Sequence, residues 1–505
     1  MQFTRSGKFS RTSTTTNTTT GQVLSTSGVY GSSVIYTASG GDTTLTGSDA
    51  NEAFIYDLTL SGTNALRFSG FTSFDAGAGD DIIDFTVRTA NAGSEYATDA
   101  AVYGGLGNDV IWTAGSHLKT VYGDTTIIAG TSASDMVQAG NDTIDLSAAS
   151  VGTAVLGDGS LRWAKGGNDT ITGSTSNDTL SGDGNVGGLA NTKGTGGNDI
   201  IYGGAGRDTI FGEGQFMGGQ TGSTCIGGDD VIYAYNATTA GTETDNIYGE
   251  SQDFGAGASV TVIGGNDTIY GSNGDNALFG DGNSDGGGAS ANVTAGNDTI
   301  YGRDGTDTIL GDGRNAAFGN GSTVTGGADT LYGDDGGDTL YGDFSLVGNG
   351  NNSTGGHAFG GADLLYGGAG DDTLIGDATT VNQGGTLTCG NDILDGGTGD
   401  DKLYGDVSGT INASTTATRG DDTFVFAPGS GADTIYDFDQ STGSLDHHDL
   451  IDVSAYGYSS GSQLDIIGNG TASVVIDFGG GNSVTVQNKA GTALVLDSPD
   501  FLFST

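Results

Sequence analysis

Positive charge is scarce in this sequence. Its 505 residues include 15 lysines and arginines against 62 aspartates and glutamates, which gives a formal net charge of −47. A chain this acidic repels polyanions, so nucleic acid is not expected as a partner. It also repels itself, so cations are needed wherever many of its carboxylates lie close together.

Residues typical of catalytic and metal centres are also few. There are four histidines, His117, His357, His447 and His448, and two cysteines, and no Cys/His cluster. The sequence has neither a His-Glu-x-x-His zinc motif nor a Gly-x-Ser-x-Gly nucleophile elbow, and no long amphipathic helical region typical of a pore-forming toxin. The abundant acids leave open a carboxylate-pair hydrolase, but repeat position accounts for most of them. We therefore expect no enzymatic activity and name no catalytic residue.

Long hydrophobic runs are absent as well. No apolar stretch approaches the ~20 residues of a membrane span, so the chain is not expected to be membrane-spanning. Residues 1–22, MQFTRSGKFSRTSTTTNTTTGQ, contain no apolar segment of the kind found in a Sec-type signal peptide. If the protein is exported, another signal is expected.

Glycine is the residue that dominates instead, with 98 copies. This content alone suggests disorder, but hydrophobic residues make up 34 % of the chain and Val, Ile and Leu recur at regular places, which argues against a random coil. Helix is disfavoured because glycine and Asp-Thr-Ile phrases are poor helix formers. Residues 326–344, GGADTLYGDDGGDTLYGDF, show the pattern: Asp-Thr-Leu-Tyr-Gly-Asp occurs twice in this stretch.

The chain is a repeat array with a period of about 30 residues over roughly ten coils. A first phrase, Gly-x-Asp followed by Thr or an aliphatic residue, places its acid at Asp142, Asp169, Asp199, Asp230, Asp267, Asp298, Asp329, Asp363, Asp392 and Asp422. A second phrase follows in each coil, at Asp178, Asp208, Asn276, Asp307, Asp338, Asp372 and Asp401. A third acid follows that, at Asp183, Glu213, Asp281, Asp312, Asp343, Asp377 and Asp406, and one longer coil shifts these markers to Asp245 and Glu250.

Each coil also carries a surplus of about 12 residues beyond two nonapeptides, always at the same place. Examples are GNVGGLANTKGT (184–195), GRNAAFGNGSTVT (313–325) and ATTVNQGGTLTC (378–389). If the coils stack, every insert leaves from the same edge. The sequence therefore predicts a two-sheet solenoid with a third, irregular layer of inserts along one edge.

Several nine-residue segments resemble the RTX nonapeptide, Gly-Gly-x-Gly-x-Asp-x-U-x, in which U is a large aliphatic residue. They are GGLGNDVIW (104–112), GGAGRDTIF (203–211), GGAGDDTLI (367–375) and GGTGDDKLY (396–404). The resemblance covers roughly residues 75–422. It implies an all-β fold, a right-handed parallel β-roll solenoid with calcium between adjacent turns, in a type I-secreted exoprotein, with S-layer-like proteins among the candidates.

The chemistry of the repeat agrees with calcium binding. Glycines permit positive φ angles and tight turns that point carbonyls inward, and carbonyls with carboxylates are hard oxygen ligands that suit Ca²⁺. The alternative is that each Asp forms a turn by bonding to its own backbone. By the resemblance, the side-chain ligands are Asp81, Asp109, Asp142, Asp169, Asp178, Asp199, Asp208, Asp230, Asp267, Asp298, Asp307, Asp329, Asp338, Asp363, Asp372, Asp392, Asp401 and Asp422.

Other acids of the repeat have two equally weighted interpretations, as further metal ligands or as solvated loop acids. These are Asp183, Asp245, Asp281, Asp312, Asp343, Asp377 and Asp406. Three positions deviate from aspartate, namely Glu213, Glu250 and Asn276. Because an amide is a neutral and weaker ligand, calcium is least expected at Asn276.

Two apolar ladders are expected to fill the roll. The first comprises Ile144, Ile171, Ile201, Ile232, Ile269, Ile300, Leu331, Leu365, Leu394 and Phe424. The second comprises Leu180, Ile210, Ile247, Leu278, Ile309, Leu340, Leu374 and Leu403. A third ladder, Tyr202, Tyr233, Tyr270, Tyr301, Tyr332 and Tyr366, should lie on an outer face. It either covers the sheet beneath the inserts, which we favour, or forms a surface for self-association or for sugar rings.

The two cysteines should remain reduced. Cys225 and Cys389 lie about five coils apart, roughly 24 Å if each coil rises by one ~4.8 Å strand spacing. A disulfide needs α-carbons within about 7 Å. Two free thiols are therefore expected.

The ends depart from the repeat. Residues 1–22 form a Thr-rich arm whose charges, Arg5, Lys8 and Arg11, are basic, and which is either a flexible tail or an anchor for anionic glycolipid or a neighbouring subunit. We expect an N-terminal β cap over 23–74, the roll over 75–422 and a C-terminal cap over 423–505. In that cap SVVIDF and NSVTVQ read as antiparallel strands. By the resemblance, it also carries an uncleaved type I secretion signal, and its two histidines are expected to be surface or turn residues.

These features favour a secreted structural protein. We expect it to fold on calcium outside a Gram-negative-type bacterium and to self-assemble into a surface layer, sheath or filament, with the type I export machinery and other copies of itself as partners. The alternative is an extracellular adhesin, matrix or ligand-binding protein that uses the outer face for a glycan or for ice. Thr is interrupted by Ile200, Val231 and Leu364 beside the tyrosines, which weighs against ice.

Overall fold

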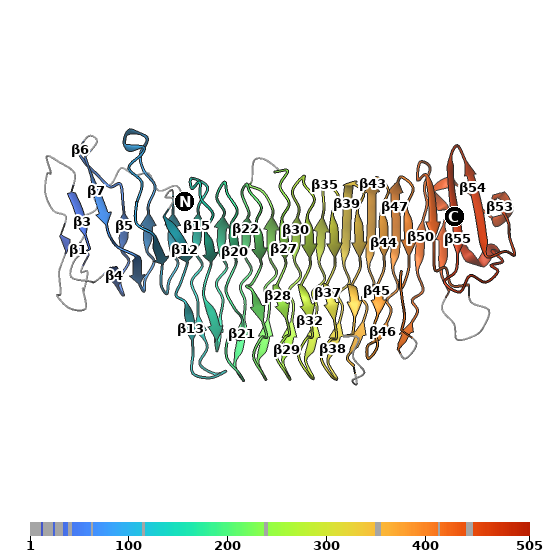
Figure 1. Cartoon of the computed structure of the whole chain (residues 1–505), viewed down its shortest axis with the longest axis horizontal. Coiled ribbons are helices and arrows are strands. Elements are labelled where there is room, and N and C mark those ends of the chain that lie inside the picture. Colours follow the sequence, from blue (N-terminus) through green and yellow to red (C-terminus); the bar gives the residue numbers. More distant parts are fainter. Residues whose placement is uncertain are drawn as a thin grey trace.

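The chain forms a parallel β-solenoid of about 12 turns, stacked along one long axis from the N-terminal to the C-terminal end (Figure 1). The computed structural model describes residues 12–13, 24–25, 34–38, 43–61, 64–113, 117–236, 241–348, 355–412, 415–440 and 448–504. Helix in these residues is confined to short 3-10 turns, namely η1 (Thr89–Asn91), η2 (Ser454–Tyr456), η3 (Gly461–Gln463) and η4 (Ser498–Asp500). The predicted all-β parallel solenoid is confirmed.

The first sheet of the main roll collects the strand that follows the first acid of each coil. Its path is β5 (Ala53–Ile55), β9 (Ile82–Asp84), β11 (Val110–Trp112), β15 (Thr143–Asp145), β19 (Thr170–Thr172), β22 (Ile200–Tyr202), β26 (Val231–Tyr233), β30 (Thr268–Tyr270), β34 (Thr299–Tyr301), β39 (Thr330–Gly336), β43 (Leu364–Ala369), β47 (Ile393–Thr398), β50 (Thr423–Val425), β52 (Leu450–Asp452) and β56 (Phe501–Leu502), with β35 (Asp304–Gly305) beside β39. Neighbouring strands on this path pair parallel and in register, so that Ile171 pairs with Ile201 and Ile201 with Ile232.

The second sheet holds the strand that follows the second acid. Its pairings lead from β4 (Thr44–Ser48) through β8 (Ser73–Gly77), β10 (Ala100–Tyr103), β12 (Leu118–Tyr122), β16 (Ala154–Leu156), β20 (Thr179–Ser181), β23 (Thr209–Phe211), β27 (Asn246–Tyr248), β31 (Ala277–Phe279), β36 (Thr308–Leu310), β40 (Thr339–Tyr341), β44 (Thr373–Ile375), β48 (Lys402–Tyr404) and β51 (Ala432–Ile435) to β55 (Asn482–Gln487), β54 (Ser473–Gly479) and β53 (Asp465–Ile467). The pairings β55–β54 and β54–β53 are antiparallel, as expected for the C-terminal runs.

The core of the roll lies between these two sheets. All eighteen residues of the two predicted apolar ladders, ten in one and eight in the other, have 0 % of their surface exposed. Burying each such aliphatic side chain contributes roughly 1.5–3 kcal/mol relative to exposure. Tight turns join the sheets, and Gly204 and Gly206 take φ angles of 108° and 116° there, which an L-residue adopts only with strain.

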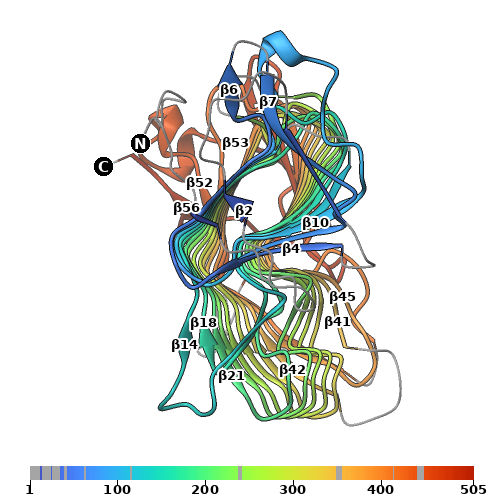
Figure 2. The same ribbon diagram turned by 90° about the vertical axis from the view of Figure 1, so that its left-hand side faces the viewer.

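The inserts form a second lobe with strands and a core of their own, seen below the main roll in the end-on view (Figure 2). One of its sheets comprises β14 (Val137–Gln138), β18 (Ala164–Lys165), β21 (Lys193–Thr195), β25 (Thr224–Ile226), β29 (Thr261–Ile263), β33 (Asn292–Thr294), β38 (Thr323–Thr325), β42 (His357–Phe359), β46 (Thr386–Thr388) and β49 (Thr416–Thr418). The facing strands are β13 (Ile127–Ala129) with β17 (Ser160–Arg162), and β24 (Phe216–Met217), β28 (Ser251–Phe254), β32 (Gly282–Asp285), β37 (Gly313–Ala316), β41 (Phe344–Val347) and β45 (Ala378–Val381).

The prediction of an irregular insert layer is therefore wrong. Most strands of the second lobe point an apolar residue into its core, and successive coils superpose these residues, as Val262, Val293 and Val324 illustrate. Stacking lets each insert bury a side chain against the next copy, so a segment too polar to fold alone forms a regular strand within the array.

Five strands near the N-terminus form two small sheets of their own. β1 (Thr12–Ser13) pairs with β2 (Leu24–Ser25), and β7 (Asn64–Ser69) lies between β3 (Val34–Thr37) and β6 (Thr59–Ser61). The basic residues Arg5, Lys8 and Arg11 of the predicted arm lie outside the described residues, as does His447. No helix among the described residues is long and apolar enough to cross a membrane.

Candidate calcium centre

A first column of aspartates runs along the solenoid, one per coil, just before each strand of the first sheet. The backbone N–H of each aspartate donates to Oδ1 of the aspartate in the next coil. These N···O distances are 2.6–3.0 Å throughout the series that begins at Asp81 and ends at Asp449. The column comprises Asp81, Asp109, Asp142, Asp169, Asp199, Asp230, Asp267, Asp298, Asp329, Asp363, Asp392, Asp422 and Asp449.

The second carboxylate oxygen of most of these residues has no protein partner. It is buried and accepts no hydrogen bond in Asp109, Asp142, Asp169, Asp199, Asp230, Asp267, Asp298, Asp329, Asp363, Asp392 and Asp422. Leaving a buried charged acceptor unsatisfied is costly. The unused oxygens therefore form a line of vacant acceptor positions along the solenoid.

A second column lies at the opposite turn, before the second sheet, and uses the same bonding pattern. The N–H of Asp307, for example, donates to Oδ1 of Asp338 at 2.7 Å, and that of Asp338 to Asp372 at 2.7 Å. The column comprises Asp178, Asp208, Asp245, Asn276, Asp307, Asp338, Asp372, Asp401 and Asp433. Oδ2 is again buried without a partner in Asp208, Asp307, Asp338, Asp372, Asp401 and Asp433.

A third column of acids lies at the neck between the main roll and the second lobe, opposite the first column. From Asp124 to Asp406 each acid accepts a hydrogen bond from the glycine two residues before a first-column aspartate, as in Gly197 N–H to Asp183 at 2.8 Å and Gly327 N–H to Asp312 at 2.8 Å. Asp437 instead accepts from the N–H groups of Gly405 at 3.0 Å and Asp406 at 3.2 Å. All are buried: Asp124, Asp158, Asp183, Glu213, Glu250, Asp281, Asp312, Asp343, Asp377, Asp406 and Asp437.

Glycines leave room beside the vacant oxygens. A Cβ added to Gly182 would lie 1.9 Å from Oδ2 of Asp199 and 2.1 Å from the carbonyl oxygen of Gly212 in the next coil. At the second column, a Cβ on Gly333 would lie 2.6 Å from Oδ2 of Asp338 and 2.4 Å from the carbonyl oxygen of Gly367. Carboxylate and carbonyl oxygens thus converge on space that only glycine leaves open, and this all-oxygen donor set fits Ca²⁺.

First-column and third-column acids converge on shared positions. The carboxylate oxygens of Asp109, Asp124 and Asp142 lie within 4.8 Å of one another, and so do those of Asp142, Asp158 and Asp169. Asp142 belongs to both groups, so a cation in one group and a cation in the next would share a ligand. Successive sites along the neck are linked in this way.

The pKa values of the column acids reflect their burial without a positively charged partner. Burial, followed by repulsion from neighbouring acids, raises the pKa of Asp199, Asp267 and Asp343 well above its usual value. In the second column burial raises the pKa of Asp307 to about 8 and that of Asp338 to about 7. Within the described residues, no lysine, arginine or histidine forms an ion pair with a column acid from Asp109 onward. The columns therefore favour either protons or bound cations.

In one coil the side chain of Asn276 places an amide N–H donor in the second column. Asn276 occupies the second column, and its amide nitrogen donates to the carbonyl oxygens of Gly274 at 2.7 Å and Ser272 at 3.2 Å. A donor of the protein thus lies where the other coils present a vacant acceptor. Weak calcium binding at this coil remains a prediction.

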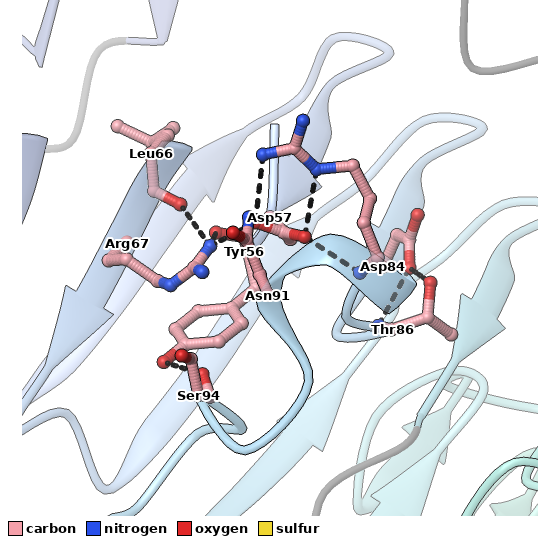
Figure 3. Close-up of polar contacts among 9 residues, drawn as sticks. Tyr56, Asp57, Leu66, Arg67, Asp84, Thr86, Asn91 and Ser94 are labelled. Atoms are coloured by element: carbon pink, nitrogen blue, oxygen red, sulfur yellow. Dashed lines mark hydrogen bonds and ion pairs between the residues drawn. The ribbon is translucent and has the colours of Figure 1, made fainter. Parts of the chain in front are cut away.

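A contrasting acid, Asp57, lies buried in the N-terminal region (Figure 3). Arg88 donates to its Oδ2 from the backbone N–H at 2.7 Å and from Nε at 2.9 Å, Asn91 donates to Oδ1 at 2.9 Å, and Arg67 donates to Oδ1. Although burial opposes ionisation, these donors lower the pKa of Asp57 to about 2. At this site the protein itself supplies the positive charge, from two guanidinium groups, that keeps a buried carboxylate ionised without a metal.

The structure brings the predicted ligand residues into these columns. The eighteen principal candidates lie in the first and second columns, Asp245 lies in the second, and the other six less certain acids lie in the third. Sequence reasoning missed Asp124, Asp158 and Asp437 in the third column and assigned Asp433 and Asp449 only to the cap. The Gly-Asp pairs that begin at Gly123 and Gly157 were the available signal.

The six tyrosines form a stack on the outer face of the first sheet. Adjacent rings from Tyr202 to Tyr366 have centroids 4.8–5.0 Å apart and planes within 3–8° of parallel. Each ring is partly exposed. A shorter aromatic stack on the second sheet, Phe211–Tyr248–Phe279, was not anticipated.

Comparison with known proteins identifies the repeat. A family model described as the RTX calcium-binding nonapeptide repeat (4 copies) matches residues 101–116, 163–185, 193–215, 264–286, 286–313, 323–344, 357–379 and 390–407. No curated protein matches the chain significantly. The matched segments carry acids of all three columns, so the chain contains RTX calcium-binding nonapeptide repeats, and their number implies several Ca²⁺ ions.

Proposed function

We propose that this is a secreted structural protein that folds when it meets calcium outside the cell and then assembles with copies of itself into a surface layer, sheath or filament. The observation that carries the calcium-dependent part is the set of buried, vacant carboxylate oxygens in three columns. The repeat coils and caps leave little sequence for a separate catalytic domain, and RTX solenoids are typically structural or toxin-associated, which supports a non-enzymatic role.

The columns supply the folding switch. First-column and second-column aspartates would hold calcium through Oδ2, with glycine carbonyl oxygens completing each site, and third-column acids would add ligands at the neck. Bound Ca²⁺ supplies the positive charge that the columns lack. Because the stacked acids come together only in the folded chain, binding free energy becomes folding free energy. In a calcium-poor cytosol the same acids repel one another, which keeps the chain unfolded and fit for export by a type I system.

The neck ties the second lobe to this switch. Third-column acids directly precede the inserts, whereas first-column acids precede the first-sheet strands of the roll, and both point at the same positions, as in the Asp142, Asp158 and Asp169 group. A cation held there would fasten both lobes at once. The whole cross-section of each coil is therefore expected to become ordered in one calcium-dependent step.

The support for self-assembly is the repetitive side surface of the solenoid. The roll is long, and most of its coils carry the same second lobe on one side (Figure 1). A repetitive side surface of this kind can bind identical copies in a regular lattice. The basic arm of residues 1–22 would reach an acidic neighbouring roll or an anionic cell-surface glycolipid.

A second candidate function, an extracellular adhesin or glycan-binding matrix protein, is favoured by the tyrosine stack. Flat, partly exposed rings at about 5 Å spacing offer an apolar platform for sugar rings. This function needs calcium for folding but not self-assembly.

Light scattering and electron microscopy of the purified full chain separate these functions. Samples would be compared without calcium and with millimolar calcium, with magnesium as the control ion. We expect sheets or filaments only with calcium. A compact calcium-bound monomer at all concentrations would contradict the assembly role and direct attention to glycan binding by the tyrosine stack.

A further inference from the structure

One thiol, that of Cys389, lies beside the acids of the third column. Cys389 lies directly before Gly390, and its Sγ and the carboxylate oxygens of Asp377 and Asp406 all lie within 4.8 Å of one another. The three side chains are buried, with 9 %, 0 % and 7 % of their surface exposed, respectively. They belong to two successive coils of the neck.

The position of Cys389 is glycine in most other coils, including Gly326 and Gly360. A Cβ added to Gly360 would lie 2.0 Å from Oδ1 of Asp377 and 2.5 Å from Oδ2 of Asp343. A side chain at this position therefore points between two consecutive third-column acids. Cys389 does so one coil later, between Asp377 and Asp406.

The last coil shows that this position can carry positive charge. There the residue is Arg419, whose guanidinium pairs with Asp439 at 2.8 Å and is also attracted by Asp406. The chain thus uses the same register position to present a cation to the end of the third column. At Cys389 the same position carries a thiol, which can bind a cation.

The acids beside Cys389 have capacity for a further ligand. Oδ1 of Asp377 accepts the N–H of Gly390 at 2.8 Å, but Oδ2 of Asp377 is buried and has no partner. Oδ1 of Asp406 accepts the N–H of Gly420 at 2.6 Å. The vacant Oδ2 of Asp377 and the thiol thus lie together at the neck.

From this arrangement we propose that Asp377, Cys389 and Asp406 form a mixed sulfur–oxygen site that prefers Zn²⁺ or a similar softer divalent cation over Ca²⁺. Thiolate is a ligand for Zn²⁺ and for other transition metals, whereas Ca²⁺ takes oxygen ligands. On binding, the thiol releases its proton to solvent, and the cation is held by one thiolate and two carboxylates. The site places one transition-metal ion within an otherwise all-oxygen column.

Cys225 provides a matched control within the same chain. It is also buried and also in the second lobe, but its Sγ donates to the carbonyl oxygen of Val186 at 3.4 Å and lies 3.9 Å from Oγ of Ser223. No group of metal-binding side chains found among the described residues includes it. It shares the chemistry of Cys389 but not the carboxylates.

The test uses the full chain, folded in millimolar calcium, and titrates it with Co²⁺ while recording the thiolate-to-metal charge-transfer band. We expect one Co²⁺ per chain with this band in the wild type and in Cys225→Ser, and displacement of the band by one equivalent of Zn²⁺. We expect loss of the band in Cys389→Gly, which restores the residue of the two preceding coils. Cys389→Ser, which keeps the side-chain size, should lose it as well. Circular dichroism checks that each variant is folded.

Three results would overturn the proposal. The first is the absence of a charge-transfer band in the folded wild type. The second is loss of the band in Cys225→Ser but not in Cys389→Gly. The third is displacement of the band by millimolar calcium with the same midpoint as by Zn²⁺. Because the wild-type titration alone gives the first result, the proposal remains testable even if both Cys389 variants fail to fold. Calcium-dependent folding is measured separately, so its failure would be distinguishable.

Discussion

Asp57 and the column acids are buried to a similar degree but are stabilised by different means. Asp57 receives hydrogen bonds from Arg67, Arg88 and Asn91 (Figure 3), and its pKa falls to about 2. Asp298 receives one backbone N–H on Oδ1 and nothing on Oδ2, and burial raises its pKa well above the usual value. The guanidinium groups that make a buried charge tolerable in the first case are missing in the second.

This difference teaches what the columns require. A buried carboxylate without a positive partner costs several kcal/mol, and the columns repeat that cost in nearly every coil. With 15 basic residues in the chain, protein side chains are too few to neutralise them. The fold is therefore complete only with external cations, whereas the Asp57 cluster is complete by itself.

Acidification should have the largest effect on the calcium-free chain. The folded-state pKa of Asp208 and Asp307 is raised to about 8 and that of Asp372 to about 6 by burial. A raised pKa gives stability that is fully present below the unfolded value near 3.8 and lost as pH rises through 6 to 8. With a chelator present, circular dichroism should report a folded solenoid near pH 4 and an unfolded chain near pH 8. With saturating calcium this dependence should disappear, and an unfolded chain at both pH values would count against the account.

Among substitutions, removing two consecutive column acids should have the largest effect on the calcium concentration needed for folding. Asp298→Ala with Asp329→Ala removes side-chain ligands of adjacent coils and should raise the calcium concentration needed for folding by roughly tenfold, or about 1.4 kcal/mol. Asp304→Ala with Asp335→Ala is the matched control, because these acids lie in the same coils and are exposed. Both variants lose two negative charges, so equal shifts in calcium titrations followed by circular dichroism would argue for a general charge effect.

Breaking the Asp57 cluster should destabilise the protein without changing its calcium requirement. Asp57→Ala removes the buried carboxylate that Arg67 and Arg88 contact and should lower the free energy of unfolding by about 2–3 kcal/mol. Because the pKa of Asp57 is lowered to about 2, its contribution is present above pH ~4 and lost as pH falls through 2, opposite to the columns. Denaturant unfolding at saturating calcium measures the loss. A large shift of the calcium midpoint would contradict the separation of the two regions.

A stabilising effect is expected at Asp285, a buried acid within the core of the second lobe. It occupies the register position of Phe254 and Ala316, and neither of its carboxylate oxygens has a partner. Asp285→Asn removes the charge at constant size and should stabilise the folded protein at neutral pH by about 1–3 kcal/mol. Asp253→Asn, at a partly exposed site, should change little. Destabilisation by Asp285→Asn in thermal unfolding would indicate that Asp285 itself holds a cation.

The sequence was sufficient to predict the roll, because its signals repeat with the coil. The apolar residues from Ile144 to Phe424 recur once per coil and all lie in the core. The second lobe was not predicted, because each insert carries little apolar signal amid Gly, Ser, Thr and Asn. Val262, Val293 and Val324 recur 31 residues apart and were the available signal.

The charge pattern was only partly predictable for a similar reason. Third-column acids such as Asp124 and Asp158 follow a glycine, but their coils depart from the repeat on either side, and only stacking shows that they face the first column. The partners of Asp57 are brought together by the fold alone, from positions 10 to 34 residues away. Such contacts have no periodic signature in the sequence.

The most direct test of the central claim is a calcium titration of the metal-free full chain, with circular dichroism and bound calcium recorded on the same samples. The account predicts an unfolded chain without calcium and a steep folding transition with millimolar calcium. It also predicts that many calcium ions bind per chain within that transition. A chain that is already folded in chelator at neutral pH, or that folds while binding no calcium, would contradict it.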